Sequence, residues 1–151
     1  MKVKRLSLLN FRGIDRLSVD FTERTTAFAG VNGVGKSAVL DALAIALSQL
    51  TWRINGHPLK SRPIALDDIR HGAEFARIEL TVELRGAELS WATVTNRKKG
   101  QHSDPLRKSD LEALNEAVKQ LDAEWEHVET DRQDPYNLPL AVYYDVNRAV
   151  L

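Results

Sequence analysis

The sequence contains no cysteine, and this absence removes several kinds of chemistry. Disulfide bonds, cysteine nucleophiles and zinc sites with thiolate ligands are excluded. The histidines are scattered without the spacing of metal ligands; they are His57, His71, His102 and His127. No run of about 18 apolar residues is present that could span a bilayer, and the N-terminus lacks the apolar core of a signal peptide. We therefore expect a cytoplasmic protein without a membrane segment.

Proline and glycine are also sparse, with 5 and 8 residues in 151, and 43% of the residues are hydrophobic. This composition predicts one globular domain. The formal charge is zero but unevenly spread, because residues 1–110 hold 18 Lys+Arg against 12 Asp+Glu, while residues 111–151 hold 3 against 9. Such a split is typical of solvated faces. The alternative is that a basic cluster contributes to a nucleic-acid-binding surface; the candidates are Lys2, Lys4 and Arg5, or Arg97, Lys98 and Lys99.

The hydrophobic pattern of the first half predicts strands followed by one long helix. Apolar residues alternate with polar ones around residues 6–8 and 17–21, and residues 25–29 form a short strand-like run. From Lys36 to about Leu50 nearly every position is apolar or small. A helix of that kind is expected to be buried on most of its faces, against a sheet.

The second half predicts a hairpin, an amphipathic helix and a further strand. Residues 76–84 alternate strictly, and a short link at residues 85–88 joins them to residues 89–95. Ser109 and Glu112 have the spacing of a helix capping box, and one apolar side follows; it consists of Leu111, Leu114, Val118, Leu121 and Trp125. Residues 138–146 are almost continuously apolar, which favours a central strand.

The segment GVNGVGKS at residues 30–37 matches the phosphate-binding loop G-x-x-x-x-G-K-[ST]. Gly30 and Gly35, with Gly33 between them, allow backbone N–H groups to turn toward phosphate oxygens. Lys36 is expected to reach the β- and γ-phosphates and to stabilise transition-state charge, and the Ser37 hydroxyl is expected to ligate Mg²⁺. The predicted strand before the loop and the helix after it are the context that such a loop requires.

Hydrolysis needs more than a phosphate cradle. A P-loop enzyme normally adds a carboxylate after a second strand to organise Mg²⁺. Asp145 is the candidate, with the alternative that it only ends the strand, because no second acid follows it. Asp67 and Asp68 form a pair of adjacent acids that we interpret as a turn or helix cap in preference to a catalytic dyad.

These residues resemble a known family. The order of Asn10, Phe11 and Arg12 followed by G-x-N-G-x-G-K-S is similar to the N-terminal lobe of ABC-type ATPase heads in the SMC, RecF and SbcC group. Two stretches, SRPIALDDIRHGAEFARIEL and LPLAVYYDVNRAVL, resemble a narrower branch of AAA/ABC ATPases from bacterial anti-phage systems, of the Septu and retron-associated types.

The resemblance implies an α/β P-loop NTPase fold. Its N-terminal lobe has an antiparallel β-subdomain beside a partly parallel core sheet with flanking helices, here as a single domain over residues 1–151. It implies ATP and Mg²⁺ as cofactors. It also implies a set of nucleotide-binding residues; they are Arg12, Gly30, Asn32, Gly33, Val34, Gly35, Lys36, Ser37 and Ala38. Tyr144 and Arg148 match a pattern near the γ-phosphate sensing loop, although the usual glutamine is not evident.

The resemblance further implies that the chain lacks parts that such ATPases need for hydrolysis. No signature motif, Asp-Glu strand end or switch histidine occurs, and in this family those parts belong to a C-terminal lobe and a second head. We expect ATP binding by this chain, and ATPase activity only in a completed homodimer of heads with a nuclease or other effector, in DNA transactions or anti-phage defence. Two alternatives remain open, namely a P-loop kinase or GTPase, and a nucleotide-responsive interaction module that uses the helix at residues 109–127.

Overall fold

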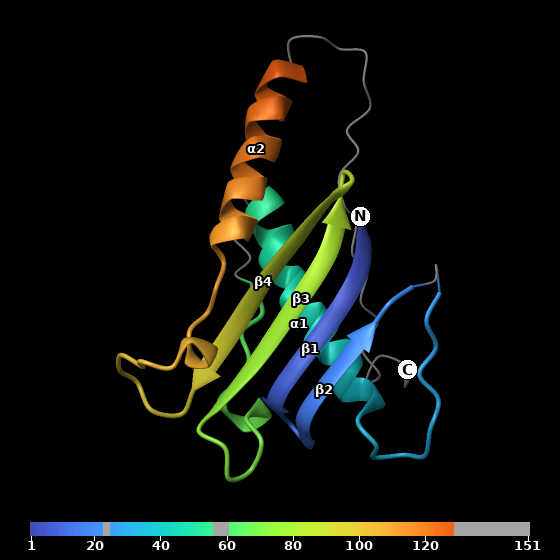
Figure 1. Cartoon of the computed structure of the whole chain (residues 1–151), viewed down its shortest axis with the longest axis vertical. Helices are drawn as coiled ribbons and strands as arrows, with labels where there is room; N and C mark the ends of the chain where they lie inside the picture. Colours follow the sequence, from blue (N-terminus) through green and yellow to red (C-terminus); the bar gives the residue numbers. More distant parts are fainter. Residues whose placement is uncertain (23–24, 56–60, 129–151) are drawn as a thin grey trace, which may run out of the picture.

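The structure, a computed structural model, describes residues 1–22, 25–55 and 61–128. Its strands pair in the order β2-β1-β3-β4, and every neighbouring pair is antiparallel. Figure 1 shows α1 running behind this sheet and α2 beside its β4 edge. The elements are β1 (Lys2–Phe11), β2 (Ile14–Asp20), α1 (Lys36–Asn55), the 3₁₀ turn η1 (Leu66–Asp68), β3 (Phe75–Leu84), β4 (Ala87–Asn96), the 3₁₀ turn η2 (Pro105–Arg107) and α2 (Glu112–Val128).

The central strand β3 shows why the sheet has one buried face. Ile78, Leu80 and Val82 are fully buried, while the alternate residues between them carry polar side chains. The period of two places these groups on opposite faces. Arg85 and Gly86 then form a two-residue turn with φ of 52° and 82°, as a tight hairpin requires. The predicted strand at residues 76–84 and the predicted hairpin are both confirmed.

Helix α1 forms the other half of the core. Ile45 and Leu50 are fully buried, and the Trp91 indole Nε1 of β4 donates a hydrogen bond to the Ala46 carbonyl at 3.1 Å. The predicted helix is confirmed, but it runs on to Asn55 instead of ending near Leu50. The expectation of burial on most faces is only partly met, because Leu40 and Trp52 are 42% and 39% exposed.

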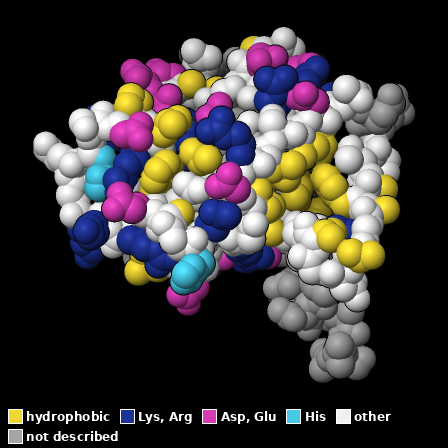
Figure 2. Space-filling model, turned by 60° about the horizontal axis from the view of Figure 1, so that its bottom comes forward, with side chains coloured by type: hydrophobic (Ala, Val, Ile, Leu, Met, Phe, Trp, Pro, Cys, Tyr) yellow, Lys and Arg dark blue, Asp and Glu magenta, His cyan; other side chains and the backbone are white. Residues whose placement is uncertain are grey.

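Part of the apolar surface of the described chain is uncovered. Figure 2 shows hydrophobic side chains gathered in one patch on the face seen from the lower end of Figure 1. The large hydrophobic side chains that are exposed include Val31 and Val34, in the glycine-rich loop, as well as Leu40 and Trp52 on α1. No helix of the described residues is long and apolar enough to cross a membrane.

The start of α2 differs from the prediction. Ser109 does not cap the helix, because its Oγ accepts a hydrogen bond from the Val94 backbone N–H at 2.9 Å. Asp110 pairs with Ala92 through two backbone hydrogen bonds of 2.7 and 2.9 Å, which keeps this segment extended until Glu112. The predicted apolar side is confirmed at Leu114, Val118 and Leu121, which are buried, while Leu111 is half-buried. The side chain of Trp125, also predicted on this side, lies outside the described part of the chain.

The predicted strand at residues 25–29 is wrong for the described chain. These residues form no strand, and all of them except the half-buried Phe28 are exposed. A strand exists only through hydrogen bonds to a neighbour, and no described strand pairs with these residues. Phe28 instead contacts the edge of the Phe21 ring, with ring centroids 6.4 Å apart. The parallel part of the expected sheet is absent from the described strands, and the predicted strand at residues 138–146 lies outside the described residues.

Candidate phosphate-binding site

The glycine-rich loop leads directly into α1 and borders a pocket of about 480 Å³. The pocket brings together residues from two places in the chain: the β1–β2 turn and the N-terminus of α1. It is lined by Arg12, Gly13, Ile14, Asn32, Gly33, Val34, Gly35, Lys36, Ser37 and Ala38. Gly30 does not line it, but the Gly30 carbonyl takes part in holding Lys36. Gly13 and Ile14 are the lining residues that the sequence did not single out.

The backbone around the pocket offers hydrogen-bond donors to a ligand. The first bond of the helix runs from the Val39 N–H to the Gly35 carbonyl at 3.1 Å. The N–H groups of Lys36, Ser37 and Ala38 therefore have no backbone acceptor within the described ranges, as expected for a helix N-terminus. These donors and the partial positive charge of the helix end favour an anion.

The shape of the loop depends on two glycines with left-handed backbone angles. Gly33 and Gly35 have φ of 87° and 98°. A Cβ at Gly33 would meet no atom within 4 Å, and one at Gly35 would lie 3.6 Å from the Ile14 side chain. Space is therefore available at both positions, and the backbone angle is what demands glycine.

Lys36 and Ser37 supply the polar side chains of the loop. The Lys36 ammonium donates hydrogen bonds to the Gly30 and Val31 carbonyls, at 2.7 and 2.8 Å. Both acceptors are neutral, so a phosphate would be a stronger partner for this cation. Ser37 is exposed, and its hydroxyl makes no hydrogen bond to the described chain. The hydroxyl is thus available for a metal ion, as the motif predicts.

Arg12 lies at the other side of the pocket, in the tight β1–β2 turn with φ of 52°. Its Nε donates to Asp68 Oδ1 at 2.8 Å, and its Nη1 donates to Asp41 Oδ2. Burial lowers the pKa of the Arg12 guanidinium, but the hydrogen bonds to Asp68 and Asp41 outweigh it, so the net shift of the pKa is upward. Arg12 therefore stays charged and keeps a defined position beside the loop.

Asp41 and Asp68 are the site residues that sequence reasoning missed. Asp68 was predicted as a turn or helix cap, and this is confirmed, because its Oδ2 accepts a hydrogen bond from the Ala65 N–H at 3.0 Å. Its contact with Arg12 joins residues 56 positions apart, which no local pattern reveals. A signal for Asp41 was present in the sequence, because it is the only acidic residue of α1 and the other residues from 38 to 47 are all apolar.

The residues of this pocket fit a nucleotide phosphate chain with Mg²⁺. They combine free backbone N–H groups, a lysine, an arginine and an unengaged serine hydroxyl, which are the donor and ligand types that such a chain uses. Within the described residues no group of three or more His, Cys, Asp or Glu side chains is placed to hold a metal by itself. The predicted metal carboxylate, Asp145, lies outside the described residues, as do Tyr144 and Arg148.

The sequence of the chain matches one known protein family along most of its length. Residues 1–140 match a family model described as the AAA ATPase domain. The chain belongs to this AAA ATPase domain family. The match covers most of the chain and includes the whole phosphate loop, so the predicted class of P-loop NTPase fold is confirmed.

Individual relatives of this AAA ATPase domain agree with the predicted SMC and RecF grouping. The DNA replication and repair protein RecF of Flavobacterium johnsoniae is 32% identical over 101 residues, which cover 67% of this chain and 25% of RecF. The Retron Ec83 probable ATPase of Escherichia coli is 30% identical over 88 residues, covering 57% and 16%. The Chromosome partition protein Smc of Bacillus subtilis is 34% identical over 85 residues, covering 55% of this chain and 7% of Smc. The chain thus spans a quarter or less of the length of the curated relatives.

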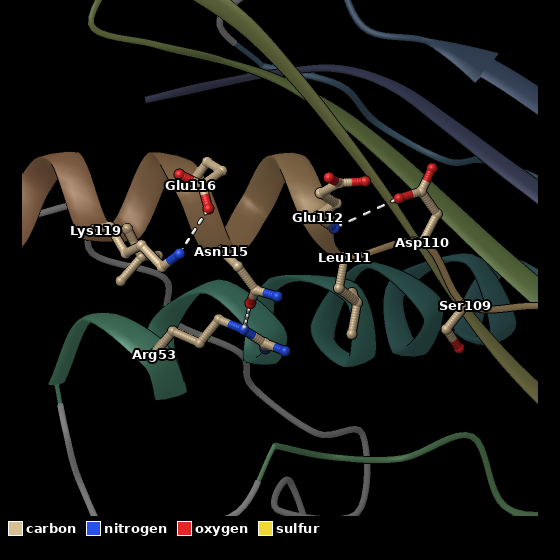
Figure 3. A pocket seen from close by; sticks show the side chains of 9 residues that line it. Arg53, Ser109, Asp110, Leu111, Glu112, Asn115, Glu116 and Lys119 are labelled. Atoms are coloured by element: carbon tan, nitrogen blue, oxygen red, sulfur yellow. Dashed lines mark hydrogen bonds and ion pairs between the residues drawn. The ribbon is translucent and has the colours of Figure 1, made fainter.

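A larger groove, of about 660 Å³, lies between the C-terminal end of α1 and α2. Figure 3 shows Arg53 reaching from α1 to Asn115 of α2, where its Nε donates to Asn115 Oδ1 at 2.8 Å. The Arg53 Nη1 donates to the carbonyl and side-chain oxygens of Gln49, at 2.7 and 3.1 Å. Burial lowers the pKa of Arg53. The bond to Asn115 joins the two helices, whereas the bonds to Gln49 stay within α1. The groove holds none of the predicted site residues.

Proposed function

We propose that this AAA ATPase domain binds Mg-ATP at the N-terminal end of α1. One observation carries the proposal: free N–H groups of Lys36, Ser37 and Ala38 lie in the same pocket as two cationic side chains. Such a convergence of donors on open space is the arrangement that binds phosphate. The family match supports a nucleotide as the phosphate compound.

Each lining residue has a role in this proposal. The backbone between Asn32 and Ala38 surrounds the phosphates, and Lys36 leaves the loop carbonyls to contact the β- and γ-phosphates. The Ser37 hydroxyl ligates Mg²⁺, and Arg12 adds positive charge from the opposite wall. Asp145 is proposed as a further metal carboxylate, on the sequence pattern alone.

ATP hydrolysis is proposed for the completed assembly and not for this chain by itself. The chain spans a quarter or less of its curated relatives, which leaves room for a C-terminal lobe in the whole protein. We propose that a second copy of the head closes over the nucleotide. The relatives' names, a DNA replication and repair protein and a retron ATPase, support a role in DNA transactions or anti-phage defence with an effector subunit.

The two alternative functions have less support. A kinase or GTPase is disfavoured by the family match, and the sequence has no N-K-x-D guanine motif. An interaction module that uses the helix at residues 109–127 has less support because the apolar face of α2 is buried against its own domain and is not available to a partner. Its apolar residues Leu114, Val118 and Leu121 are 0%, 6% and 5% exposed.

Isothermal titration of the chain with Mg-ATP tests the proposal. The wild type is expected to bind, and Lys36→Ala is expected to weaken binding at least about 100-fold, because charge-assisted contacts to the phosphates are lost. Lys119→Ala is the matched control, since Lys119 lies on α2 and pairs with Glu116 at 2.7 Å. Equal affinity of the wild type and Lys36→Ala would remove the proposed site.

A further inference from the structure

A mostly buried carboxylate close to a phosphate site needs an explanation. Asp41 lies one helical turn after Ser37 on α1, and its side chain is only 13% exposed. A negative charge there repels a bound phosphate and costs desolvation unless cations neutralise it. Leucine or alanine, the types that dominate this helix, would avoid both costs. The contacts of Asp41 indicate what the carboxylate contributes.

Asp41 and Asp68 hold one guanidinium between them. Asp41 contributes Oδ2 from α1, and Asp68, the last residue of η1, contributes Oδ1. The backbone repeats this attachment, because the Arg12 N–H donates to the Asp68 carbonyl at 2.6 Å. The side chain of Arg12 is thus bound by two carboxylates that are distant in sequence and that do not themselves line the pocket.

Both carboxylates are themselves fixed. The second oxygen of Asp68 accepts from the Ala65 N–H at 3.0 Å, and the second oxygen of Asp41 accepts from Arg62 Nη1 at 3.3 Å. Arg12 and Arg62 together balance the two negative charges, so the cluster does not oppose an anion in the pocket. Because the cluster carries no net charge, its contribution to the pocket is the fixed position of Arg12 and not a general change of the electrostatic potential.

The arrangement leaves one edge of Arg12 for a ligand. Its Nε and Nη1 are occupied by the carboxylates, whereas Nη2 donates no hydrogen bond within the described chain. The side chain is 32% exposed and lines the pocket. An unrestrained arginine loses about 1.5–2 kcal/mol of rotamer entropy when a ligand immobilises it. Here the carboxylates have already restricted it.

We propose that Asp41 and Asp68 are positioning residues, which hold the Nη2 edge of Arg12 toward the phosphates of the bound nucleotide. The inference rests on the proposed function. It assigns no contact between the carboxylates and the nucleotide, because both act through Arg12. In the ligand-free chain the same geometry keeps Arg12 ordered before the nucleotide arrives.

The direction of the change in Mg-ATP affinity distinguishes a positioning role of the two carboxylates from a purely electrostatic one. If the carboxylates only add negative charge near the pocket, Asp41→Asn and Asp68→Asn tighten Mg-ATP binding. If they position Arg12, the same variants weaken it, because the freed guanidinium must be ordered by the ligand. In an Arg12→Ala background the weakening disappears, since the residue being positioned is gone.

The experiment titrates Mg-ATP into the full chain and its variants, with thermal unfolding as a check of folding. We expect Asp41→Asn and Asp68→Asn each to weaken binding roughly tenfold, and to have no further effect on Arg12→Ala. Glu79→Gln is the matched control, because Glu79 pairs with Arg77 at 2.9 Å on the sheet, away from the pocket. We expect it to leave the affinity unchanged.

A second readout uses the chain without nucleotide. The Nε–H resonance of Arg12, followed by ¹⁵N NMR of labelled arginine, is expected to show slow proton exchange, and Asp68→Asn is expected to abolish it. Unchanged or tighter binding by both carboxylate variants, or equal weakening in the Arg12→Ala background, overturns the positioning role alone. Failure of the wild type to bind Mg-ATP overturns the proposed function and, with it, this inference.

Discussion

The two ends of α1 each carry a cationic side chain beside an open pocket, but they differ in what the donors contact. At the C-terminal end, the Nε and Nη1 of Arg53 donate to the neutral side chains of Asn115 and Gln49 and to the Gln49 carbonyl. At the N-terminal end, several N–H groups and the Nη2 of Arg12 have no partner within the described chain. The larger pocket, about 660 against 480 Å³, lies at the end without the phosphate loop. The phosphate-loop residues, and not pocket volume, therefore support the N-terminal end as the proposed binding site.

The largest expected effect comes from comparing the loss of the cation at each end of α1 in a binding measurement. Lys36→Ala is expected to weaken Mg-ATP binding at least about 100-fold, whereas Arg53→Ala is expected to change it less than about twofold. The reason is that Lys36 faces the phosphate loop, while Arg53 lies at the far end of the same helix. A titration of both variants under identical salt checks this. Weaker binding by Arg53→Ala would contradict the comparison.

A smaller effect is expected from changing only the shape of the N-terminal end. Gly35→Ala strains a residue with φ of 98°, and we expect about tenfold weaker Mg-ATP binding because the loop must move its N–H groups to relieve about 1–2 kcal/mol of strain. Gly86→Ala is the matched control, since Gly86 has φ of 82° in the β3–β4 turn. It is expected to lose similar stability in urea unfolding but no affinity. Equal affinities of the two variants would show that the loop shape is unimportant.

The smallest effect is expected in stability. Here the substitution at the C-terminal end of α1 is expected to have the larger effect, which is the reverse of the order expected for binding. Arg53→Met keeps the apolar stem but removes its hydrogen bonds, so the free energy of unfolding should fall by about 1 kcal/mol. Lys36→Met loses the hydrogen bonds to the Gly30 and Val31 carbonyls but also removes a cation from a helix N-terminus. These effects oppose each other, so the free energy of unfolding should change by less than about 0.5 kcal/mol. Urea unfolding of both variants measures the difference. A larger loss for Lys36→Met would mean that the lysine has a structural role at this end.

The sequence predicted those elements whose signals are local. The alternation at residues 76–84, the turn at Arg85 and Gly86 and the apolar positions of α2 were all sufficient, because one strand or one helix face determines them. The phosphate loop was equally clear, since its glycines, Lys36 and Ser37 all lie within residues 30–37. The structure places Gly33, Gly35, Lys36 and Ser37 around one pocket, as the motif indicates, while Gly30 does not line it.

The predictions that failed depend on distant partners. Residues 25–29 have strand-like composition, but a strand requires a neighbour that the described sheet does not provide. Ser109 has the spacing of a cap, but the free edge of β4 offers it the Val94 N–H instead. In both cases a hydrogen-bonding partner elsewhere in the chain, or its absence, outweighed the local preference.

By itself the sequence determined the chemistry of the phosphate loop, because neighbouring residues create both its backbone angles and its charges. Only the tertiary structure decided how Arg12 is held. Asp41 and Asp68 lie 29 and 56 positions away from Arg12, and no periodicity links those positions. They meet because α1 packs behind the sheet while the segment around η1 pairs with the end of β1, as the bridge between Phe11 and Ile69 shows. Packing of the apolar core thus brings together charged groups that the chain keeps far apart.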